Sequence, residues 1–384
     1  MMSAFSYFRS LMRPFLKGRL LEVWLHFKTA LFARSFARLL VANSKIAYSE
    51  PLRAVNAKRE KLRRILFICE NMWERRELLP ELVKISEVDF IDTRELTANR
   101  DNSAEFVGAN DVAKGLALLR ERDYDLVMVY LRSGLLSEGL LNTLRESWRA
   151  PLIGLNLDDK TNFEHFEIFR QSDRPYREWA KYFDCNLSNS RSMIEVYHSN
   201  GLPCLYLPTG FHFDPTRTTT PQWKFQYLTT FVGSYKPERA KFIAELKRLG
   251  IEVTVFGSGW RDAQFNNDGW KIYGASQINL GLGYNVNGKQ ITNLKNRDFE
   301  CPGAGGCYLT TFDWELAELF RVGDEILCYR DLYDLTEVWS FYIKRPERCR
   351  EIAHAGQQRA LREHTWEQRF RAVLSQLGFD LRSS

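Results

Sequence analysis

Residues 293–311 read NLKNRDFECPGAGGCYLTT, and the rest of the chain is arranged around this stretch. Arg297 and Glu300 stand three positions apart, so a helix places a base and an acid on one face. A glycine-rich bend follows, with Gly305 and Gly306, and glycine lets the backbone approach a ligand closely. Two interpretations stay open at this point: a sugar-nucleotide site, or a surface ion pair that runs into a helix-capping glycine.

The segment before this stretch predicts a βαβ unit. Residues 226–234 form a strand-like run that ends in Phe-Val-Gly-Ser. Residues 237–249 predict a helix with proline in its first turn, and residues 251–256 predict a second strand that runs into glycine. Ligands of such sheets bind at the carboxyl ends of the strands. The residues expected there are Gly233, Ser234 and Gly257.

The segment after the stretch continues the alternation. Strands are expected at 307–311 and 325–329, with a short helix at 314–320 between them. Three helical segments close the chain, and the last of them, 365–377, follows a threonine cap with Glu367 near its start.

Residues 227–370 resemble the C-terminal domain of the CgeB-like glycosyltransferases, which are relatives of the group 1/family 4 enzymes with the GT-B fold. The resemblance implies two Rossmann-like parallel-sheet domains that face a cleft, and a last helix that crosses back to the N-terminal domain. Four motifs in order carry it: Phe-Val-Gly-Ser at 231–234, Arg-Asp-Phe-Glu at 297–300 followed by Ala-Gly-Gly at 304–306, the segment 325–331, and His-Thr-Trp-Glu-Gln-Arg at 364–369.

The resemblance also implies a role for Glu300. In that superfamily the glutamate five residues before such a glycine binds the ribose hydroxyls of the donor nucleotide, and Glu300 precedes Gly305 by this spacing. Family 4 members carry a second glutamate eight residues earlier, where this chain has Thr292. The departure leaves the retaining mechanism, and any role for a paired carboxylate, open.

The phosphates of a donor need cations or oriented amides. Gly233 and Ser234 offer amides at a helix start. Lys236, Arg239 and Arg297 supply charge, although Lys236 and Arg239 are equally typical of solvated residues in a first helical turn. A short strand is expected at 270–274, where the resemblance implies that the base is held by backbone contacts and an aromatic wall. The further donor-side candidates are Tyr273 and Gly274 at that strand, and Asn279, Tyr284 and Asn285 ahead of the central stretch, with Tyr284 equally typical of a core residue.

The N-terminal half predicts a second parallel sheet. Apolar strands alternate with helices of 10 to 13 residues, including one at 111–121, which favours a sheet covered on both faces. No G-x-G-x-x-G fingerprint follows the first strand, so a dinucleotide cofactor is not supported. The expected strands are 65–69, 88–91, 125–130, 151–157, 185–188 and 204–208.

Asp158, Asp159 and His165 are the candidate catalytic residues. The two aspartates follow the strand at 151–157, and His165 lies in a helix expected at 161–169. A carboxylate just past a strand end faces the ligand side of such a sheet. The alternative is that Asp159 only caps the following helix. The two aspartates stand side by side and do not form an Asp-x-Asp motif, so we expect metal-independent chemistry and no cofactor.

The length of the chain indicates how many domains it holds, and its cysteines indicate the redox state of its compartment. The 384 residues suggest a basic helical appendage at 1–60, an acceptor-side domain at 61–215, a nucleotide-sugar domain at 216–363 and a crossing helix at 364–384. The interdomain crossing is expected at 208–215, which contains His212. Seven cysteines without a Cys-x-x-Cys pair fit free thiols in a reducing cytoplasm.

The appendage carries the basic charge. The first 64 residues hold 14 Lys/Arg and 3 Asp/Glu. Residues 20–41 are apolar and aromatic, but Lys28, Arg34 and Arg38 interrupt them, and each such charge at mid-bilayer costs roughly 2.5 to 3.5 kcal/mol. A helix at the surface of an anionic membrane fits better than a spanning one. The alternative is that it packs on the enzyme or on a partner chain, so an oligomer is also compatible.

The sequence therefore predicts a glycosyltransferase that moves a sugar from a nucleotide donor, with UDP favoured, to a cell-surface glycan, glycolipid or protein acceptor. It would act in the cytoplasm or at the inner face of the membrane, and no nucleic-acid partner is expected. Two alternatives stay open: a non-hydrolysing sugar-nucleotide epimerase, and a non-catalytic sugar-nucleotide-binding or scaffolding subunit.

Overall fold

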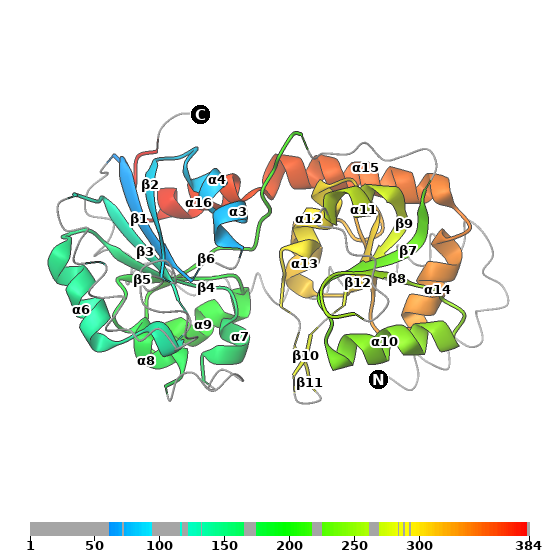
Figure 1. Ribbon diagram of the computed structural model, residues 1–384, viewed down its shortest axis with the longest axis horizontal. Coiled ribbons are helices and arrows are strands. Elements are labelled where there is room, and N and C mark those ends of the chain that lie inside the picture. The colour runs from blue at the N-terminus through cyan, green and yellow to red at the C-terminus, as the bar shows by residue number, and fades with distance from the viewer. Residues whose placement is uncertain are drawn as a thin grey trace, which may run out of the picture.

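Two parallel α/β domains make up the described part of the protein, and they lie side by side (Figure 1). The computed structural model describes residues 61–70, 73–93, 116, 122–131, 133–164, 174–216, 225–260, 269–282, 284–286, 289–291 and 293–381. The basic appendage at 1–60 and His165 lie outside these residues, as does most of the helix expected at 111–121.

The N-terminal domain is built on a six-stranded parallel sheet with the order β2-β1-β3-β4-β5-β6. Its central strands are buried on both faces, which explains why they read as continuous apolar runs. The strands are β1 (Arg64–Cys69), β2 (Glu87–Asp92), β3 (Leu126–Tyr130), β4 (Leu152–Asn156), β5 (Cys185–Ser188) and β6 (Cys204–Tyr206).

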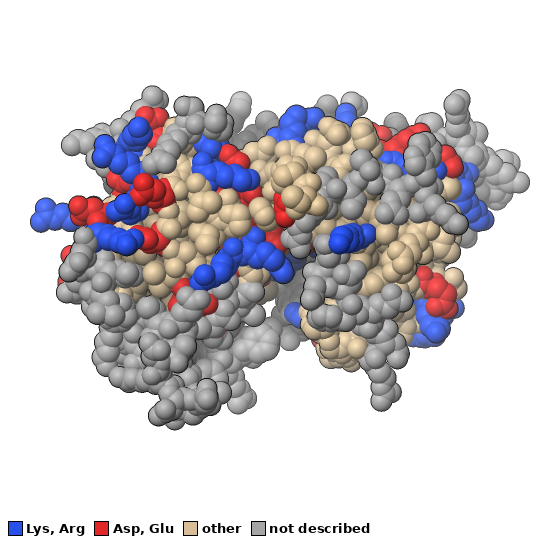
Figure 2. Space-filling view, turned by 45° about the horizontal axis from the view of Figure 1, so that its top comes forward, with Lys and Arg blue, Asp and Glu red and all other residues tan. Residues whose placement is uncertain are grey.

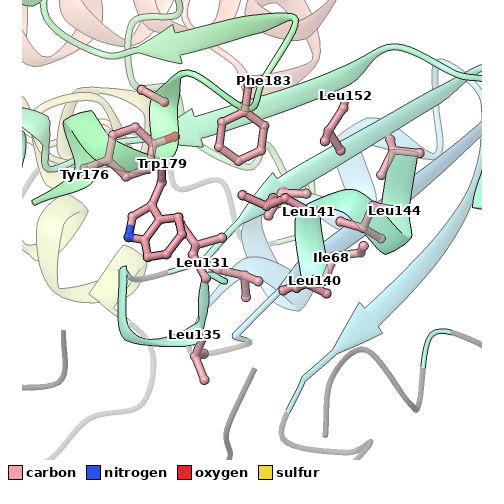
Figure 3. Packing of buried hydrophobic residues seen from close by; sticks show 14 of the residues in the cluster. Ile68, Leu131, Leu135, Leu140, Leu141, Leu144, Leu152, Tyr176, Trp179 and Phe183 are labelled. Atoms are coloured by element: carbon pink, nitrogen blue, oxygen red, sulfur yellow. The ribbon is translucent and has the colours of Figure 1, made fainter. Parts of the chain in front are cut away.

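Helices cover both faces of this sheet. On one face, Leu140, Leu141 and Leu144 of α6 (Glu138–Ser147) pack toward the sheet residues Ile68 and Leu152 (Figure 3). The Ser137 hydroxyl caps this helix by accepting from the Leu140 amide. The remaining helices of the domain are α3 (Glu74–Glu77), α4 (Leu79–Leu82), the 3-10 turn η3 (Ser133–Leu135), α7 (Asp159–Asn162), α8 (Tyr176–Ala180) and α9 (Arg191–Ser199).

The C-terminal domain has a five-stranded parallel sheet with the order β13-β12-β9-β7-β8. Numbered within each domain, the strands of this sheet have the doubly wound order 2-1-3-4-5, and those of the N-terminal sheet have the order 2-1-3-4-5-6. The strands are β7 (Tyr227–Val232), β8 (Thr254–Phe256), β9 (Ser276–Leu280), β12 (Tyr308–Thr311) and β13 (Leu327–Tyr329), with an antiparallel pair β10 (Tyr284–Val286) and β11 (Lys289–Ile291) beside them. The helices are α10 (Pro237–Arg248), α11 (Gly269–Ala275), α12 (Arg297–Gly303), α13 (Trp314–Leu319), α14 (Leu332–Tyr342) and α15 (Pro346–Glu363). The last helix, α16 (Trp366–Gln376), follows the return of the chain to the N-terminal domain.

Two elements differ from the sequence expectation. Residues 270–274 belong to the helix α11 and not to a strand. Trp270 and Tyr273 are spaced by three and enter the same apolar cluster, which is the spacing of a helix face. A short apolar run does not distinguish the period of a helix, about 3.6 residues, from the period of a strand, about two residues. Strand β8 begins only at Thr254, because Gly250 with φ +78° ends the preceding helix and residues 251–253 connect the two.

The chain crosses between the domains twice, and the two crossings run side by side. The Phe211 amide donates to the His364 carbonyl (3.2 Å) and the Trp366 amide donates to the Phe211 carbonyl (3.0 Å). Helix α16 then lies against the N-terminal domain (Figure 1). Its Trp366 and Phe370 pack into the core of that domain. Thr365 caps this helix as expected, but its capping-box partner is Gln368 and not Glu367.

The described surface carries mixed charge, and the cysteines are free thiols. Basic and acidic side chains are interspersed over the described residues on the face in Figure 2. All seven cysteines are free, and six of them are buried, in line with the expectation from their spacing. Among the described residues, no helix is both long enough and apolar enough to cross a membrane.

Candidate functional site

The candidate site lies where the strand order of the C-terminal sheet reverses. Strands β7 and β9 are neighbours, yet the chain leaves β7 toward β8 and leaves β9 toward β12. Ligands of doubly wound sheets bind at the carboxyl ends of such strands. Gly233 and Ser234 follow β7, Gly281 follows β9, and α12 of the central stretch contacts the same edge.

Arg297 is the cation of this edge. Its Nη1 donates to the Val232 carbonyl oxygen (2.7 Å), and its guanidinium lies over the Phe231 ring, 4.9 Å from the centroid. Burial lowers the pKa of Arg297, but the nearby Tyr308, Tyr273 and Asp298 raise it by more, so the net shift is upward. The guanidinium therefore stays charged at any physiological pH.

Asp298 and Tyr308 support Arg297, and sequence reasoning missed both. The Tyr308 hydroxyl donates to Asp298 Oδ1 (2.6 Å), and Arg297 Nε lies 3.5 Å from the Tyr308 hydroxyl oxygen. The other oxygen of Asp298 accepts from the Lys295 amide (2.7 Å) at the start of α12. Burial raises the pKa of Asp298, against the Tyr308 and Lys295 hydrogen bonds, which lower it. The only sequence signal was the position of Asp298 between Arg297 and Glu300.

Glycines let three loops meet at this point. A Cβ on Gly233 would lie 2.9 Å from Arg297 Nη1 and 3.3 Å from Arg239 Nη1. Gly257 has φ +126°, and a Cβ there would lie 2.4 Å from the Gly233 carbonyl oxygen. A Cβ on Gly281 would lie 2.2 Å from the Tyr308 hydroxyl oxygen. Gly281 was not singled out from the sequence, although it directly follows the buried strand β9.

The Gly233 amide does not play the role that the sequence suggested. It donates to the Phe256 carbonyl (2.8 Å), which continues the ladder between β7 and β8. The Gly233 carbonyl oxygen accepts from Trp260 Nε1 (2.8 Å). Because both backbone groups of Gly233 are engaged, this residue shapes the loop and offers no amide to a phosphate.

The other basic candidates lie at the start of α10. Arg239 Nη1 donates to the Ser234 carbonyl oxygen (2.8 Å) and lies 3.3 Å from its hydroxyl oxygen. The Arg239 guanidinium also lies over Phe231, 5.7 Å from the centroid, so two guanidinium groups share that ring. Lys236 holds the N-cap position of α10 and is partly exposed.

Glu300 lies on α12, one turn after Arg297, and is partly exposed. Besides burial, the Glu300 charge helps to raise the pKa of Tyr273 and of Cys301. Gly305 ends the helix with φ +79°, and a Cβ on Gly306 would lie 2.8 Å from the Cys301 sulfur. The glycines therefore turn the chain sharply from α12 into β12.

Three further candidates turn out to be internal. Asn279 Oδ1 accepts from the Thr230 hydroxyl (2.8 Å), and its Nδ2 donates to the Tyr273 carbonyl (3.0 Å), so this amide joins the sheet to α11 and does not reach toward a diphosphate. Tyr273 and Gly274 are buried in α11 rather than placed at a strand end. Tyr284 and Asn285 lie in β10, and their side chains lie outside the description.

The structure separates the two aspartates of the N-terminal domain. Asp158 is exposed and accepts from Lys295 Nζ (2.5 Å) across the domain boundary. Asp159 is 1% exposed, and neither of its carboxylate oxygens has a hydrogen-bond partner among the described residues. Burial raises the pKa of Asp159 to about 7. Asp158 and not Asp159 holds the N-cap position of α7, and the Asp158 side chain makes no capping bond.

The central stretch is also the contact with the N-terminal domain. Residues 293–296 run along the carboxyl edge of its sheet, where Asn189 Nδ2 donates to the Leu294 carbonyl (3.2 Å). Asn296 Nδ2 lies 3.4 Å from Glu77 Oε2. Glu315 of α13 accepts from the Ser190 hydroxyl (2.8 Å). Sequence reasoning missed these contacts, which join positions more than 100 residues apart.

A metal centre is not visible in the described part of the chain. No group of three or more His, Cys, Asp or Glu side chains there is placed to hold an ion. Arg297, with its Tyr308 and Asp298 partners, is the cationic group that the described C-terminal edge offers to an anionic ligand.

Comparisons with known proteins agree with this architecture. Residues 238–375 match the model of a family described as glycosyl transferase-like. No curated protein sequence matches the chain. The structure is similar to sucrose-phosphate synthase from Thermosynechococcus elongatus, with a TM-score of 0.52 and 11% identity over 82% of this chain and 98% of that one. It is also similar to HepE from Anabaena in complex with UDP and glucose, with a TM-score of 0.53 and 14% identity over 82% of this chain and 99% of that one.

At such identities the likeness to solved structures concerns the fold. The predicted GT-B arrangement of two parallel α/β domains is confirmed. The predicted glycosyltransferase family agrees with the match of residues 238–375 to the glycosyl transferase-like family model.

Proposed function

Because the chain carries a glycosyl transferase-like domain within a GT-B fold, we propose that it transfers a sugar from a nucleoside diphosphate donor to an acceptor held by the N-terminal domain. The observation that carries this proposal is the charged Arg297 at the β7/β9 edge, held by Val232, Tyr308 and Asp298. The Arg297 guanidinium has five N–H donors, and its contacts to Val232 and Tyr308 use fewer than five of them.

The chemistry follows from this placement. An acceptor hydroxyl oxygen forms a bond to the anomeric carbon, and the bond from that carbon to the diphosphate oxygen breaks. The nucleoside diphosphate leaves with the electron pair, and the hydroxyl proton passes to a carboxylate, for which Asp158 at the domain boundary is the candidate. A pre-oriented guanidinium stabilises the negative charge that grows on the leaving oxygen. Arg297 takes this role, with Arg239 and Lys236 nearby on the next loop.

UDP is the nucleotide that we favour, and the CgeB-like group is the subgroup that we favour. HepE, which shares the fold, was solved with UDP and glucose. The motifs at 231–234, 297–306 and 364–369 support the subgroup. Glu300 would bind the ribose hydroxyls, because it lies on α12 one turn beyond Arg297 and is partly exposed.

The test of the donor site is Glu300→Gln, measured by titration calorimetry with UDP and UDP-glucose. Losing a charge-assisted hydrogen bond costs roughly 1.5 to 3 kcal/mol, so we expect about tenfold to hundredfold weaker binding at an unchanged melting temperature. Glu363→Gln on α15 is a matched control, since Glu363 pairs with Arg359 and Arg362 on the same helix. Unchanged UDP affinity in Glu300→Gln would refute the ribose assignment.

A panel of sugar nucleotides separates the reaction classes. Release of free nucleotide that depends on an added acceptor supports transfer. Interconversion of the donor sugars without acceptor identifies an epimerase, and tight binding without turnover identifies a sugar-nucleotide-binding subunit.

We also propose that the acceptor is a glycan, glycolipid or protein met at a membrane surface. The 14 Lys/Arg of the first 64 residues support this, since each cation near an anionic surface contributes about 1 kcal/mol. Liposome sedimentation should show binding that increases with anionic lipid and decreases with salt. Deleting residues 1–60 should abolish it while UDP binding persists. Sedimentation of the truncated protein would assign the segment to a protein contact instead.

A further inference from the structure

The N-terminal sheet has its own point of strand reversal, and two aromatic residues flank it. Strands β1 and β3 are neighbours, while the chain leaves β1 toward β2 and leaves β3 toward β4. Trp73 follows β1 as the N-cap of α3, and Tyr130 is the last residue of β3. Their rings meet edge to face, with centroids 6.4 Å apart and planes at 74°. Both side chains are partly exposed at the edge where such sheets bind ligands.

The core fixes the position of this aromatic pair. Trp73 packs on Trp366, with ring centroids 6.2 Å apart, and Trp366 is fully buried and stacks on Phe370 of α16. The Trp73 amide donates to Glu74 Oε2 (2.8 Å), which holds the start of α3. The exposed part of Trp73 is therefore the outer end of a stack that runs into the crossing helix. A ligand meets a rigid surface there, which lowers the entropic cost of binding.

The pair also lies near the donor side. Glu77 is four residues after Trp73, a rise of about 6 Å along a helix. Glu77 accepts from the side chain of Asn296, which directly precedes Arg297 (3.4 Å). Trp73 and the proposed leaving-group cation are thus joined by one helical turn and one hydrogen bond across the domain boundary.

We propose that Trp73 and Tyr130 form the acceptor site and stack against a sugar ring. Pyranose rings carry a face of C–H groups that buries apolar area against an aromatic ring, while the ring hydroxyls stay hydrogen-bonded at its edge. The acceptor class is therefore a carbohydrate or a carbohydrate headgroup, and not a peptide hydroxyl. This inference rests on the proposed transferase function and adds the chemistry of the acceptor to it.

Saturation-transfer difference NMR with methyl glucoside, methyl galactoside, methyl N-acetylglucosaminide, maltose and lactose tests the site, with the full chain saturated with UDP. We expect at least one sugar to receive saturation from the wild type. Trp73→Ala and Tyr130→Ala should reduce that signal at least fivefold, and Trp73→Phe should keep most of it. Tyr333→Ala is the matched control, because Tyr333 is 45% exposed on α14 of the other domain.

Calorimetry with UDP separates this proposal from the donor proposal. All variants should bind UDP with wild-type affinity, and their melting temperatures show whether they fold. The acceptor assignment is overturned if no sugar in the panel binds the wild type, or if folded Trp73→Ala and Tyr130→Ala both keep the wild-type signal. A wild type that binds neither UDP nor UDP-glucose overturns the proposed function itself, whatever the sugar spectra show.

Discussion

The hydroxyl group of Ser190 donates a 2.8 Å hydrogen bond to a carboxylate oxygen of Glu315, and this bond joins the two domains. The same oxygen accepts from the Arg191 amide at the N-terminus of α9 (3.1 Å) and lies 3.5 Å from Lys160 Nζ. A carboxylate at a helix N-terminus is favoured by the helix dipole. Glu315 thus links α13 to the edge of the N-terminal sheet beside Asp158 and Asp159.

Glu315→Ala should weaken this link. The variant removes the oxygen that accepts from the Ser190 hydroxyl and from the Arg191 amide, so we expect a loss of about 1 to 3 kcal/mol in the free energy of unfolding and a larger radius of gyration in small-angle scattering. Glu318→Ala is the control, because Glu318 is 35% exposed and pairs with Arg191 at the surface. Equal effects of the two substitutions would contradict an interdomain role for Glu315.

Arg297→Lys should weaken the binding of UDP at least tenfold. A lysine ammonium lacks the planar fork that contacts Val232 and Tyr308 together, and it cannot bind a diphosphate bidentately. Calorimetry measures the effect. Arg248→Lys at the end of α10 is the control, since Arg248 is exposed and pairs with Glu245. If both variants bind UDP like the wild type, Arg297 does not contact the diphosphate.

The C-terminal edge could be predicted from sequence because its signals are local. Arg297, Glu300 and the glycines at 305 and 306 sit in one short stretch, and Gly233 and Gly257 each follow a strand-like run. The structure brings Gly233, Gly257 and Arg297 together at this edge. Local pattern was enough there, since parallel strands bring their carboxyl ends to one side.

Other features depended on tertiary partners that a sequence does not show. Asn279 looked like a ligand-reaching amide, but Thr230 and the Tyr273 carbonyl engage it inside the sheet layer. The residues at 270–274 are compatible with both a strand and a helix. In the structure they form a helix, and Trp270 packs against Phe211 in the core. Glu315 gave no signal, because its partner Ser190 lies 125 positions away.

Gly281→Ala should destabilise the protein. The added Cβ would lie 2.2 Å from the Tyr308 hydroxyl oxygen and from Thr310 Oγ1, and both side chains are buried. We expect a loss of about 1 to 3 kcal/mol in the free energy of unfolding, because overpacking forces neighbours to shift. Gly139→Ala in α6 is the matched control, since its nearest atom is 3.9 Å away and alanine favours a helix. Thermal or urea unfolding compares the two, and a neutral Gly281→Ala would show that the loop relaxes freely.

Turnover of the sugar nucleotide should persist in EDTA. Arg297, and not a bound cation, is proposed to stabilise the diphosphate, and Asp158 and Asp159 stand side by side without the spacing of an Asp-x-Asp motif. Nucleotide release is measured with and without chelator, and with Mg²⁺ or Mn²⁺ added back. Loss of activity that is restored by either ion would contradict the expectation and make Asp158 the first ligand to test.

Asp159→Asn should stabilise the protein at alkaline pH and leave it unchanged near pH 4. Burial raises the pKa of Asp159 from 3.8 to about 7, so the folded state binds this proton more tightly than the unfolded state, and stability is lost as the pH rises from about 4 to 7. A tenfold difference in proton affinity between the two states corresponds to about 1.4 kcal/mol, which predicts a gain of up to about 4 kcal/mol at pH 8 for the neutral amide. Asp158→Asn is the adjacent control, because Asp158 is 53% exposed and pairs with Lys295. Urea unfolding of both variants at pH 4, 6 and 8 measures the difference. If the gain in the free energy of unfolding for Asp159→Asn does not increase with pH, the pKa of Asp159 is not raised in the folded protein.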